Sequence, residues 1–488
     1  MLAVAIVALL APAVALLAPA ARAATGCFFD NATSPWGPRA HSYIGGNIFG
    51  DKHMTNTSSS PEACCALCQQ YASKGCVFWT FTTGSCYGRP GSCCRLKTSV
   101  AWNGRGSADP STTTSGSIEP LPPLPPPDTP DLNGTVVFSA GLGGVSNYRI
   151  PAIVQTTGSP PALVAFAEAR DGGDSSASRI AVRTSADMGA TRTWSAVTFA
   201  AGSLNSSASR AACAKDNFTN CRVGNPAAVF DAASGGVVLA YVVRGFGGGV
   251  NPEDAIGNGI SRSTDGKTWG KPTDVSAGFA GPRLNAGPVA VMPGPGTALV
   301  LESGPKKGRL LVPSHDPYGY NYATVAVSDD GGITWRTINQ TFPSMDESAL
   351  TQLPNGSVMI NMRRSPQLHP PGRGVAVSDD GGDTWGPISF DARLKTPICQ
   401  GSIVSFGGAT YFSNPASIGR NHLTIKKSTD NTATWAKSLL VEAGNSAGYS
   451  CLVQGGIQGG DGKASTEGGI LYEAVGGTIK FVRFPLSL

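Results

Sequence analysis

The chain has 488 residues, a formal net charge of +5 and only 14% charged residues. This length allows a small module beside one large domain. The charge is dilute and forms no run of Lys and Arg, which argues against a nucleic-acid partner. The 63 glycines and 36 prolines are many for a helical protein, and they favour an all-β architecture with frequent turns.

The N-terminal segment is apolar up to Ala20, and Ala21-Arg22-Ala23 follows it. Ala21 and Ala23 are small residues at positions −3 and −1 of a signal-peptidase cleavage site, which predicts a signal peptide over residues 1–23. A signal peptide implies a secreted or secretory-pathway protein. A basic start is missing, so an uncleaved membrane anchor is the alternative. No second apolar stretch approaches the roughly 20 residues that span a bilayer, so we expect no stable membrane insertion of the mature protein.

A cysteine-rich head follows, with eight of the 12 cysteines between Cys27 and Cys94. This density is typical of oxidised extracellular modules, and a zinc site is the less favoured alternative. The runs Cys64-Cys65-Ala-Leu-Cys68 and Cys93-Cys94-Arg-Leu-Lys97 resemble the PAN/apple family. That resemblance implies an α+β module over residues 24–108 that binds protein or carbohydrate. The sequence does not choose among the possible disulfide pairings.

Residues 109–131 are rich in Pro, Ser and Thr, and predict an extended linker with too little apolar surface to fold. Beyond the linker, Cys213 with Cys221 and Cys399 with Cys451 are candidate disulfides. Seven Asn-x-Ser/Thr sequons are compatible with glycosylation. They are Asn31, Asn56, Asn133, Asn205, Asn217, Asn339 and Asn355.

The body, residues 132–488, contains a repeated segment. The clearest copies are Val327-Ser-Asp-Asp-Gly-Gly-Ile-Thr-Trp335 and Val377-Ser-Asp-Asp-Gly-Gly-Asp-Thr-Trp385. Three variants centre on Asp187, Asp265 and Asp430. In these segments the Asp can accept hydrogen bonds from turn amides, Gly, where it is present, can take a positive φ, and Trp can anchor the next strand. The spacing suits one four-stranded sheet per copy, which predicts a β-propeller.

These segments resemble the Asp boxes of the sialidase (neuraminidase) family, and the resemblance implies a six-bladed β-propeller. The Asp-box aspartates are turn residues, so we do not expect Asp187, Asp265, Asp330, Asp380 or Asp430 to be catalysts. Asp boxes also occur in other extracellular propellers. Asp boxes alone therefore do not establish sialidase activity.

A sialic acid carries a carboxylate on its anomeric carbon, which arginine forks bind bidentately. Tyr148-Arg149-Ile-Pro151 resembles the family motif that supplies the first carboxylate-binding arginine, Arg149. The same resemblance nominates Arg363, within Met345-Asp-Glu347…Met362-Arg363, and Arg420, after Ser413-Asn-Pro415. Arg364 is the alternative to Arg363, because alternation along a strand lets only one of the two face a pocket.

Three residues are candidates for the chemistry. Ser446-Ala-Gly-Tyr449-Ser450 resembles the motif that contains the family's tyrosine nucleophile, Tyr449, which suits an anionic substrate because tyrosine is neutral. Glu347 would take the phenolic proton, with neighbouring Asp346 as the alternative base. Asp174 would be the acid/base catalyst, with Asp171 as the alternative.

Two further residues are expected to support substrate binding: Arg170 would line the pocket, and Glu473 would orient Arg149. Together these residues imply a retaining exo-α-sialidase that acts on sialylated glycans, glycoproteins or glycolipids and needs no metal or organic cofactor. The alternatives are a non-catalytic sialic-acid lectin, a trans-sialidase, and an Asp-box propeller acting on another polysaccharide. The sequence leaves linkage preference and the type of sialic acid open.

Overall fold

The structure is a computed structural model. It describes residues 28–29, 60–70, 78–82, 85–86, 89–90, 93–97, 113–117, 132, 134–157, 161–173, 176–191, 193–201, 220–246, 254–281, 289–318, 321–366, 368, 371–444, 448–457, 465–475 and 477–488. The expected signal peptide lies outside the described residues. No helix in the described part of the chain is long and apolar enough to cross a membrane.

The head contains one helix, α1 (Pro61–Gln70), and a sheet in the order β1-β6-β2-β5. The helix begins where Ser60 Oγ accepts a hydrogen bond from Ala63 N, with Pro61 in the first turn. A disulfide joins Cys64 of the helix to Cys94 of the sheet. The strands are β1 (Phe28–Phe29), β2 (Phe78–Thr82), β5 (Cys93–Lys97) and β6 (Thr113–Ser117), beside a short pair, β3 (Ser85–Cys86) and β4 (Arg89–Pro90).

Strand β6 lies in the segment that composition indicates to be a linker, yet it pairs with β2 along its whole length. The sequence of this strand, Thr-Thr-Ser-Gly-Ser, contains no large apolar residue. Ladder hydrogen bonds are made by the backbone, so a polar segment can still extend a sheet. The helix–sheet arrangement fits the expected α+β module, and the PAN/apple resemblance stays a prediction.

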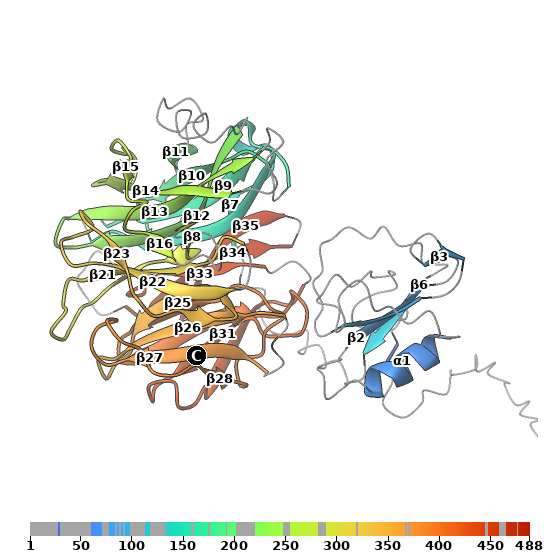
Figure 1. Cartoon of the computed structure of the whole chain (residues 1–488). Helices are drawn as coiled ribbons and strands as arrows, with labels where there is room; N and C mark the ends of the chain where they lie inside the picture. The colour runs from blue at the N-terminus through green and yellow to red at the C-terminus, as the bar shows by residue number, and fades with distance from the viewer. Residues whose placement is uncertain are drawn as a thin grey trace, which may run out of the picture.

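The body is the expected six-bladed β-propeller, in which six mainly antiparallel sheets stand around an axis (Figure 1). The first three blades, from the inner strand outward, have the following strands. Blade 1 has β8 (Asn147–Gln155), β9 (Leu163–Arg170), β10 (Ser178–Ser185) and β11 (Thr198–Ala201). Blade 2 has β12 (Asn220–Asp231), β13 (Gly236–Phe246), β14 (Asp254–Ser263) and β15 (Thr273–Asp274), with β19 (Gly296–Thr297) beside β12. Blade 3 has β18 (Met292–Pro293), β21 (Leu310–His315), β22 (Tyr322–Ser328) and β23 (Arg336–Thr337), with β20 (Leu299–Val300) beside β21 and β24 (Phe342–Pro343) beside β22.

The last three blades are more regular. Blade 4 has β25 (Met345–Gln352), β26 (Val358–Arg364), β27 (Arg373–Ser378) and β28 (Ser389–Asp391); blade 5 has β29 (Ser402–Phe406), β30 (Ala409–Pro415), β31 (Leu423–Ser428) and β32 (Lys437–Glu442); blade 6 has β33 (Ser450–Leu452), β34 (Glu467–Ala474), β35 (Thr478–Pro485) and β7 (Thr135–Phe138). A short pair, β16 (Ala280–Gly281) and β17 (Val289–Ala290), and a 3-10 turn, η2 (Leu142–Gly144), complete the body.

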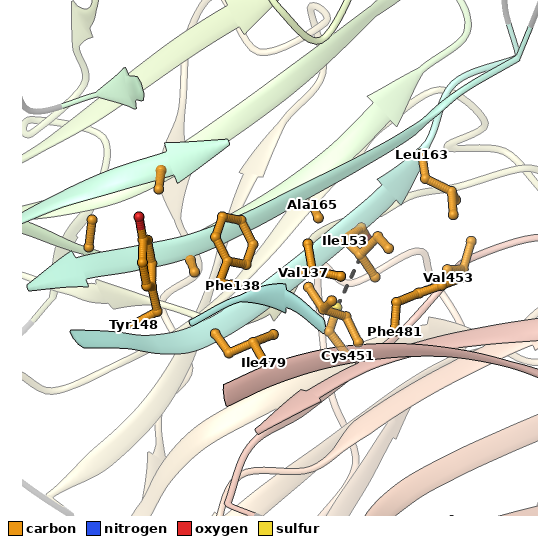
Figure 2. Close-up of a cluster of buried hydrophobic side chains, with 14 of the residues drawn as sticks. Val137, Phe138, Tyr148, Ile153, Leu163, Ala165, Cys451, Val453, Ile479 and Phe481 are labelled. Atoms are coloured by element: carbon orange, nitrogen blue, oxygen red, sulfur yellow. Dashed lines mark hydrogen bonds between the residues drawn. The ribbon is translucent and has the colours of Figure 1, made fainter. Parts of the chain in front are cut away.

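The ring closes by pairing strands from the two ends of the body, because β7 is the outer strand beside β35. In Figure 1 the red C-terminal strands lie next to the first teal strands. Figure 2 shows the apolar cluster at this closure, in which Val137 and Phe138 pack with Ile153, Cys451 and Phe481. Burying these side chains between the first and last blades stabilises the closed ring.

All five Asp boxes form the turn between the third and fourth strands of blades 1 to 5. Blade 6 takes its fourth strand, β7, from the start of the body, so no turn joins it to β35. This explains why six blades carry five boxes. In the box of blade 3, Asp330 accepts hydrogen bonds from Ile333 N and Thr334 N, and Ser328 Oγ donates to Asp330 at 2.8 Å.

The box tryptophans lie between blades, where they hold neighbouring sheets together. Trp385 packs edge-on against Phe342 of blade 3, with ring centroids 5.7 Å apart. Trp269 packs in the same way against Phe166 of blade 1 at 5.6 Å. The boxes therefore stabilise contacts between blades as well as the turns themselves.

We expect the propeller to lose stability in acid because of these turns. Hydrogen bonds lower the pKa of Asp380 to about 2, although its partial burial acts to raise it. Because this folded-state pKa lies below the unfolded value of about 3.9, the stabilisation is complete above pH ~4 and is lost as pH falls toward 2. The free energy of unfolding, measured by urea titration at several pH values, should fall across this window.

A matched pair of variants tests this expectation. Asp380→Asn should lower Tm by about 1–3 °C and weaken the acid dependence. Asp379→Asn changes the exposed neighbour in the same turn and should leave both unchanged. Equal effects of the two variants would contradict a role for the box carboxylate.

Candidate active site

A cavity of about 280 Å³ lies where the innermost strands begin, and every blade contributes to its wall. The lining residues are Arg149, Ile150, Glu168, Arg170, Ser178, Arg222, Gly224, Asn225, Val242, Arg244, Met292, Glu347, Arg363, Arg420 and Tyr449. Six residues expected from the sequence, Arg170 among them, therefore share one cavity although they are spread over 301 positions, from 149 to 449.

A bulge recurs at the cavity end of the inner strands. The register of β8 against β9 shifts between Arg149 and Ala152, and that of β12 against β13 shifts between Gly224 and Ala227. Ile150 has a φ of 60°, which is a strained conformation for a β-branched residue. Bulges turn the strand ends, so that side chains which would otherwise continue the sheet point into the cavity.

Tyr449 and Glu347 meet at the centre of the site. Tyr449 Oη donates a hydrogen bond to Glu347 Oε1, and Arg363 Nη1 lies 2.6 Å from Glu347 Oε2 and 3.3 Å from Tyr449 Oη. Burial raises the pKa of Tyr449 well above its usual value, the Glu347 charge raises it further, and Arg363 and Arg420 act in the opposite direction. The phenol is therefore neutral at rest and has a carboxylate in place to accept its proton.

Three arginines surround this tyrosine. The guanidinium carbons of Arg149 and Arg420 lie 5.3 and 5.6 Å from the Tyr449 ring centroid. Glu347 pairs with Arg363, as described above, and Glu473 pairs with Arg149 at 2.6 Å. Among the described residues no carboxylate pairs with Arg420. Three guanidinium groups gathered around Tyr449 suit a ligand that carries a carboxylate.

Glu473 lies beneath the cavity and ties two of its strands together. Its Oε1 accepts from Arg149 Nε and from Ile150 N at 3.0 Å, and its Oε2 accepts from Tyr449 N at 3.0 Å. Burial acts to raise the pKa of Glu473, but Arg149 and the two backbone donors lower it overall. The carboxylate thus fixes both Arg149 and the backbone of Tyr449.

The alternatives that the sequence left open are separated by position. Arg364 points away from the cavity and donates to the backbone carbonyls of Ser365 and Leu368. Asp346 pairs with His315 and not with Tyr449. Asp171 is exposed and does not line the cavity. Asp174 lies outside the described residues, so its expected role as acid/base catalyst stays a prediction.

The suggested disulfide between Cys399 and Cys451 is wrong, because both thiols are free and buried. Cys399 packs with Ile150 and Tyr449 beneath the site. Cys451 instead packs in the cluster that closes the ring. Cys399 precedes β29 and Cys451 lies in β33, and the two side chains pack in different clusters. Cys213 lies outside the described residues, as does the side chain of Cys221.

Comparison with known proteins agrees with this geometry. The BNR repeat-like domain family matches residues 161–460. A sialidase from Micromonospora viridifaciens is 30% identical over 406 residues, which make up 78% of this chain and 57% of that protein. The chain belongs to the sialidase family. It spans about half the length of the curated relatives it matches.

Solved sialidase-family structures share the fold. A Hadza microbial sialidase superposes with a TM-score of 0.59 at 22% identity, covering 84% of this chain and 90% of that one. The intramolecular trans-sialidase from Ruminococcus gnavus, in complex with oseltamivir carboxylate, gives a TM-score of 0.56 at 18% identity, covering 72% and 97%. These likenesses show that the chain has the same propeller fold as these solved structures.

The cavity also contains charged residues that the sequence did not single out. Glu168 pairs with Arg170 at 2.5 Å and accepts a hydrogen bond from Asn225 N. Arg222 and Arg244 stand directly opposite each other on β12 and β13. Like charges in this arrangement are unfavourable for a sheet, and here both raise the positive potential of the cavity.

One signal for Glu168 was present in the sequence. Glu168 and Arg170 are two residues apart in the apolar run Leu163–Arg170, so a strand would place both on one face. Arg222 and Asn225 carry no comparable signal, because the bulge that directs them is not visible in the residue pattern. Within the described ranges, no three His, Cys, Asp or Glu side chains gather in a group that could hold a metal ion.

Proposed function

We propose that the protein is a retaining exo-α-sialidase that removes terminal sialic acids from glycans, glycoproteins or glycolipids. The observation that carries this proposal is the Tyr449–Glu347 pair inside a ring of three arginines. A carboxylate nucleophile would be repelled by the substrate carboxylate, and a neutral phenol avoids this repulsion. The curated relatives it matches are themselves named sialidases.

In the proposed reaction the arginines hold the substrate carboxylate, and Tyr449 Oη attacks the anomeric carbon while Glu347 takes the phenolic proton. The bond to the leaving oxygen breaks, and that oxygen receives a proton from Asp174. A water molecule, deprotonated by the same aspartate, then attacks the covalent intermediate, and the proton returns from Glu347 to the tyrosine. Fixed arginines stabilise the oxocarbenium-like transition state by position and charge.

Secretion is part of the proposal. A disulfide such as Cys64–Cys94 forms and persists in oxidising compartments, which supports action outside the cytosol. We also propose that the head binds a protein or carbohydrate ligand and brings the propeller to its substrate. Deleting the head should then change localisation and leave turnover of small sialosides intact.

The proposed function is tested with a fluorogenic α-sialoside, with the sugar product followed by NMR. A retaining hydrolase releases free sialic acid first as the α-anomer, and the β-anomer appears later by mutarotation. Binding without release would favour a lectin. An intramolecular anhydro sugar, or a sialylated acceptor, would favour a trans-sialidase, because the covalent intermediate would then react with a hydroxyl in place of water.

A further inference from the structure

A buried histidine, His315, links the cavity wall to the residues around Tyr449. Its Nδ1 lies 2.7 Å from Asp346 Oδ1 and 3.1 Å from the carbonyl oxygen of Asp316. Both neighbours accept hydrogen bonds, so Nδ1 carries a hydrogen in either charge state. The proton that His315 gains or loses is therefore on Nε2, which lies 3.2 Å from Asn225 Nδ2.

The state of Nε2 determines which way the Asn225 amide faces. With neutral His315, Nε2 accepts from the Asn225 NH2 group, as the structure has it, and the amide oxygen is left for the cavity that Asn225 lines. With protonated His315, Nε2 donates and needs an oxygen. The amide must then turn over, which leaves the NH2 group for the cavity.

Only the side-chain amide of Asn225 can reorient when His315 gains or loses a proton, because the backbone around it is fixed. Asn225 N donates to Glu168 Oε1 at 2.7 Å, and its φ of 52° is a left-handed conformation that asparagine tolerates. At Gly224 a Cβ atom would come within 2.5 Å of the same Glu168 oxygen. The turn therefore holds the Asn225 side chain between His315 and the cavity.

We propose that Asn225 is a specificity-determining residue, which offers the substrate an acceptor when His315 is neutral and a donor when His315 is protonated. The inference rests on the proposed sialic-acid site. Sugar hydroxyls can donate or accept, so they are indifferent to the flip. The amide N–H of an N-acylated sialic acid can only donate, and the arginines of the cavity cannot accept from it. The acyl carbonyl oxygen can accept from those arginines in either state of His315, so the N–H is the group that depends on the orientation of Asn225.

The charged groups facing His315 set the direction of its pH dependence. These are Asp346 and Glu347 from β25 and Asp316 beyond its own strand, with Arg363 behind Asp346. Burial lowers the pKa of His315, but the carboxylates raise it above its usual value overall. The imidazolium therefore persists to a higher pH than in an ordinary histidine, and N-acylated ligands should bind more weakly below this pKa than above it.

The test compares two unreactive ligands, the 2,3-dehydro derivatives of N-acetylated sialic acid and of its deaminated, 5-hydroxyl counterpart. Their dissociation constants for the full chain are measured by calorimetry from about pH 5 to about pH 9. Titrations that affect both ligands alike cancel in the ratio of the two constants. We expect relative affinity for the N-acetylated ligand to fall about fivefold as pH drops, the effect of one hydrogen bond.

Three variants isolate the residues responsible. His315→Asn can keep an N–H toward Asp346 but cannot titrate, and Asn225→Ala removes the amide, so both should give a ratio that does not change with pH. His422→Asn is the matched control, because His422 Nδ1 also lies beside an asparagine amide, that of Asn421, but outside the cavity lining. It should keep the wild-type pH dependence. Thermal melting of each variant checks folding.

The outcomes separate this inference from the proposed function. The role of Asn225 is overturned if the ratio does not change with pH in the wild type, or if His315→Asn or Asn225→Ala keeps the wild-type pH dependence. Either result leaves the sialic-acid site intact. Failure of both ligands to bind the wild type at every pH overturns the proposed function and this inference with it.

Discussion

Tyr449→Phe should lower kcat for a fluorogenic sialoside by at least about 10³-fold, because the variant has no nucleophilic oxygen. The ring and its contacts with Arg149 and Arg420 remain, so the dissociation constant of an unreactive 2,3-dehydro sialic acid should change by less than about threefold. Steady-state kinetics and calorimetry on the same preparation measure the two quantities. This combination distinguishes a lost chemical step from a lost binding site.

Tyr148→Phe is the matched control for that substitution. Tyr148 precedes Arg149 and is fully buried, but its hydroxyl donates to Leu142 O at 2.7 Å and does not reach the cavity. Its removal should cost about 1 kcal/mol of stability and leave kcat unchanged. Equal turnover by Tyr449→Phe and wild type would show that Tyr449 is not the nucleophile.

The fold was predictable because its signal is repeated. Each Asp box places an aspartate a few residues before a tryptophan, four of the five boxes also contain glycine, and these residues favour a local turn without help from distant residues. The number of boxes did not give the number of blades directly, since the sixth blade borrows β7 from the start of the body. That feature follows from ring closure, which no local pattern records.

The candidate site was predictable only where a motif contains the residue. Arg149, Glu347 and Tyr449 stand in short segments that resemble family motifs, and the structure brings them together. Asn225 and His315 have no such segment, because their contact joins β12 to β21 across two blades. A residue pattern does not reveal which strand ends become neighbours around the axis, nor where a bulge turns a side chain inward.

The second large effect is expected for Arg363, where two adjacent arginines provide their own control. Arg363 lines the cavity and its Nη1 reaches both Glu347 and Tyr449, whereas Arg364 faces the other way. Lysine keeps the positive charge but cannot form a planar, two-pronged contact with a carboxylate. Arg363→Lys should therefore lower kcat/KM about 10²-fold or more.

Arg364→Lys should keep kcat/KM within about twofold of wild type, because Arg364 bonds only to backbone carbonyls in the described structure. The substitution should instead lower the stability of the folded protein. The comparison tests strand register as well as chemistry. A shift of β26 by one residue would exchange the two side chains, and the larger loss would then appear in Arg364→Lys. Equal losses would mean that charge near the strand end matters more than the direction in which either arginine points.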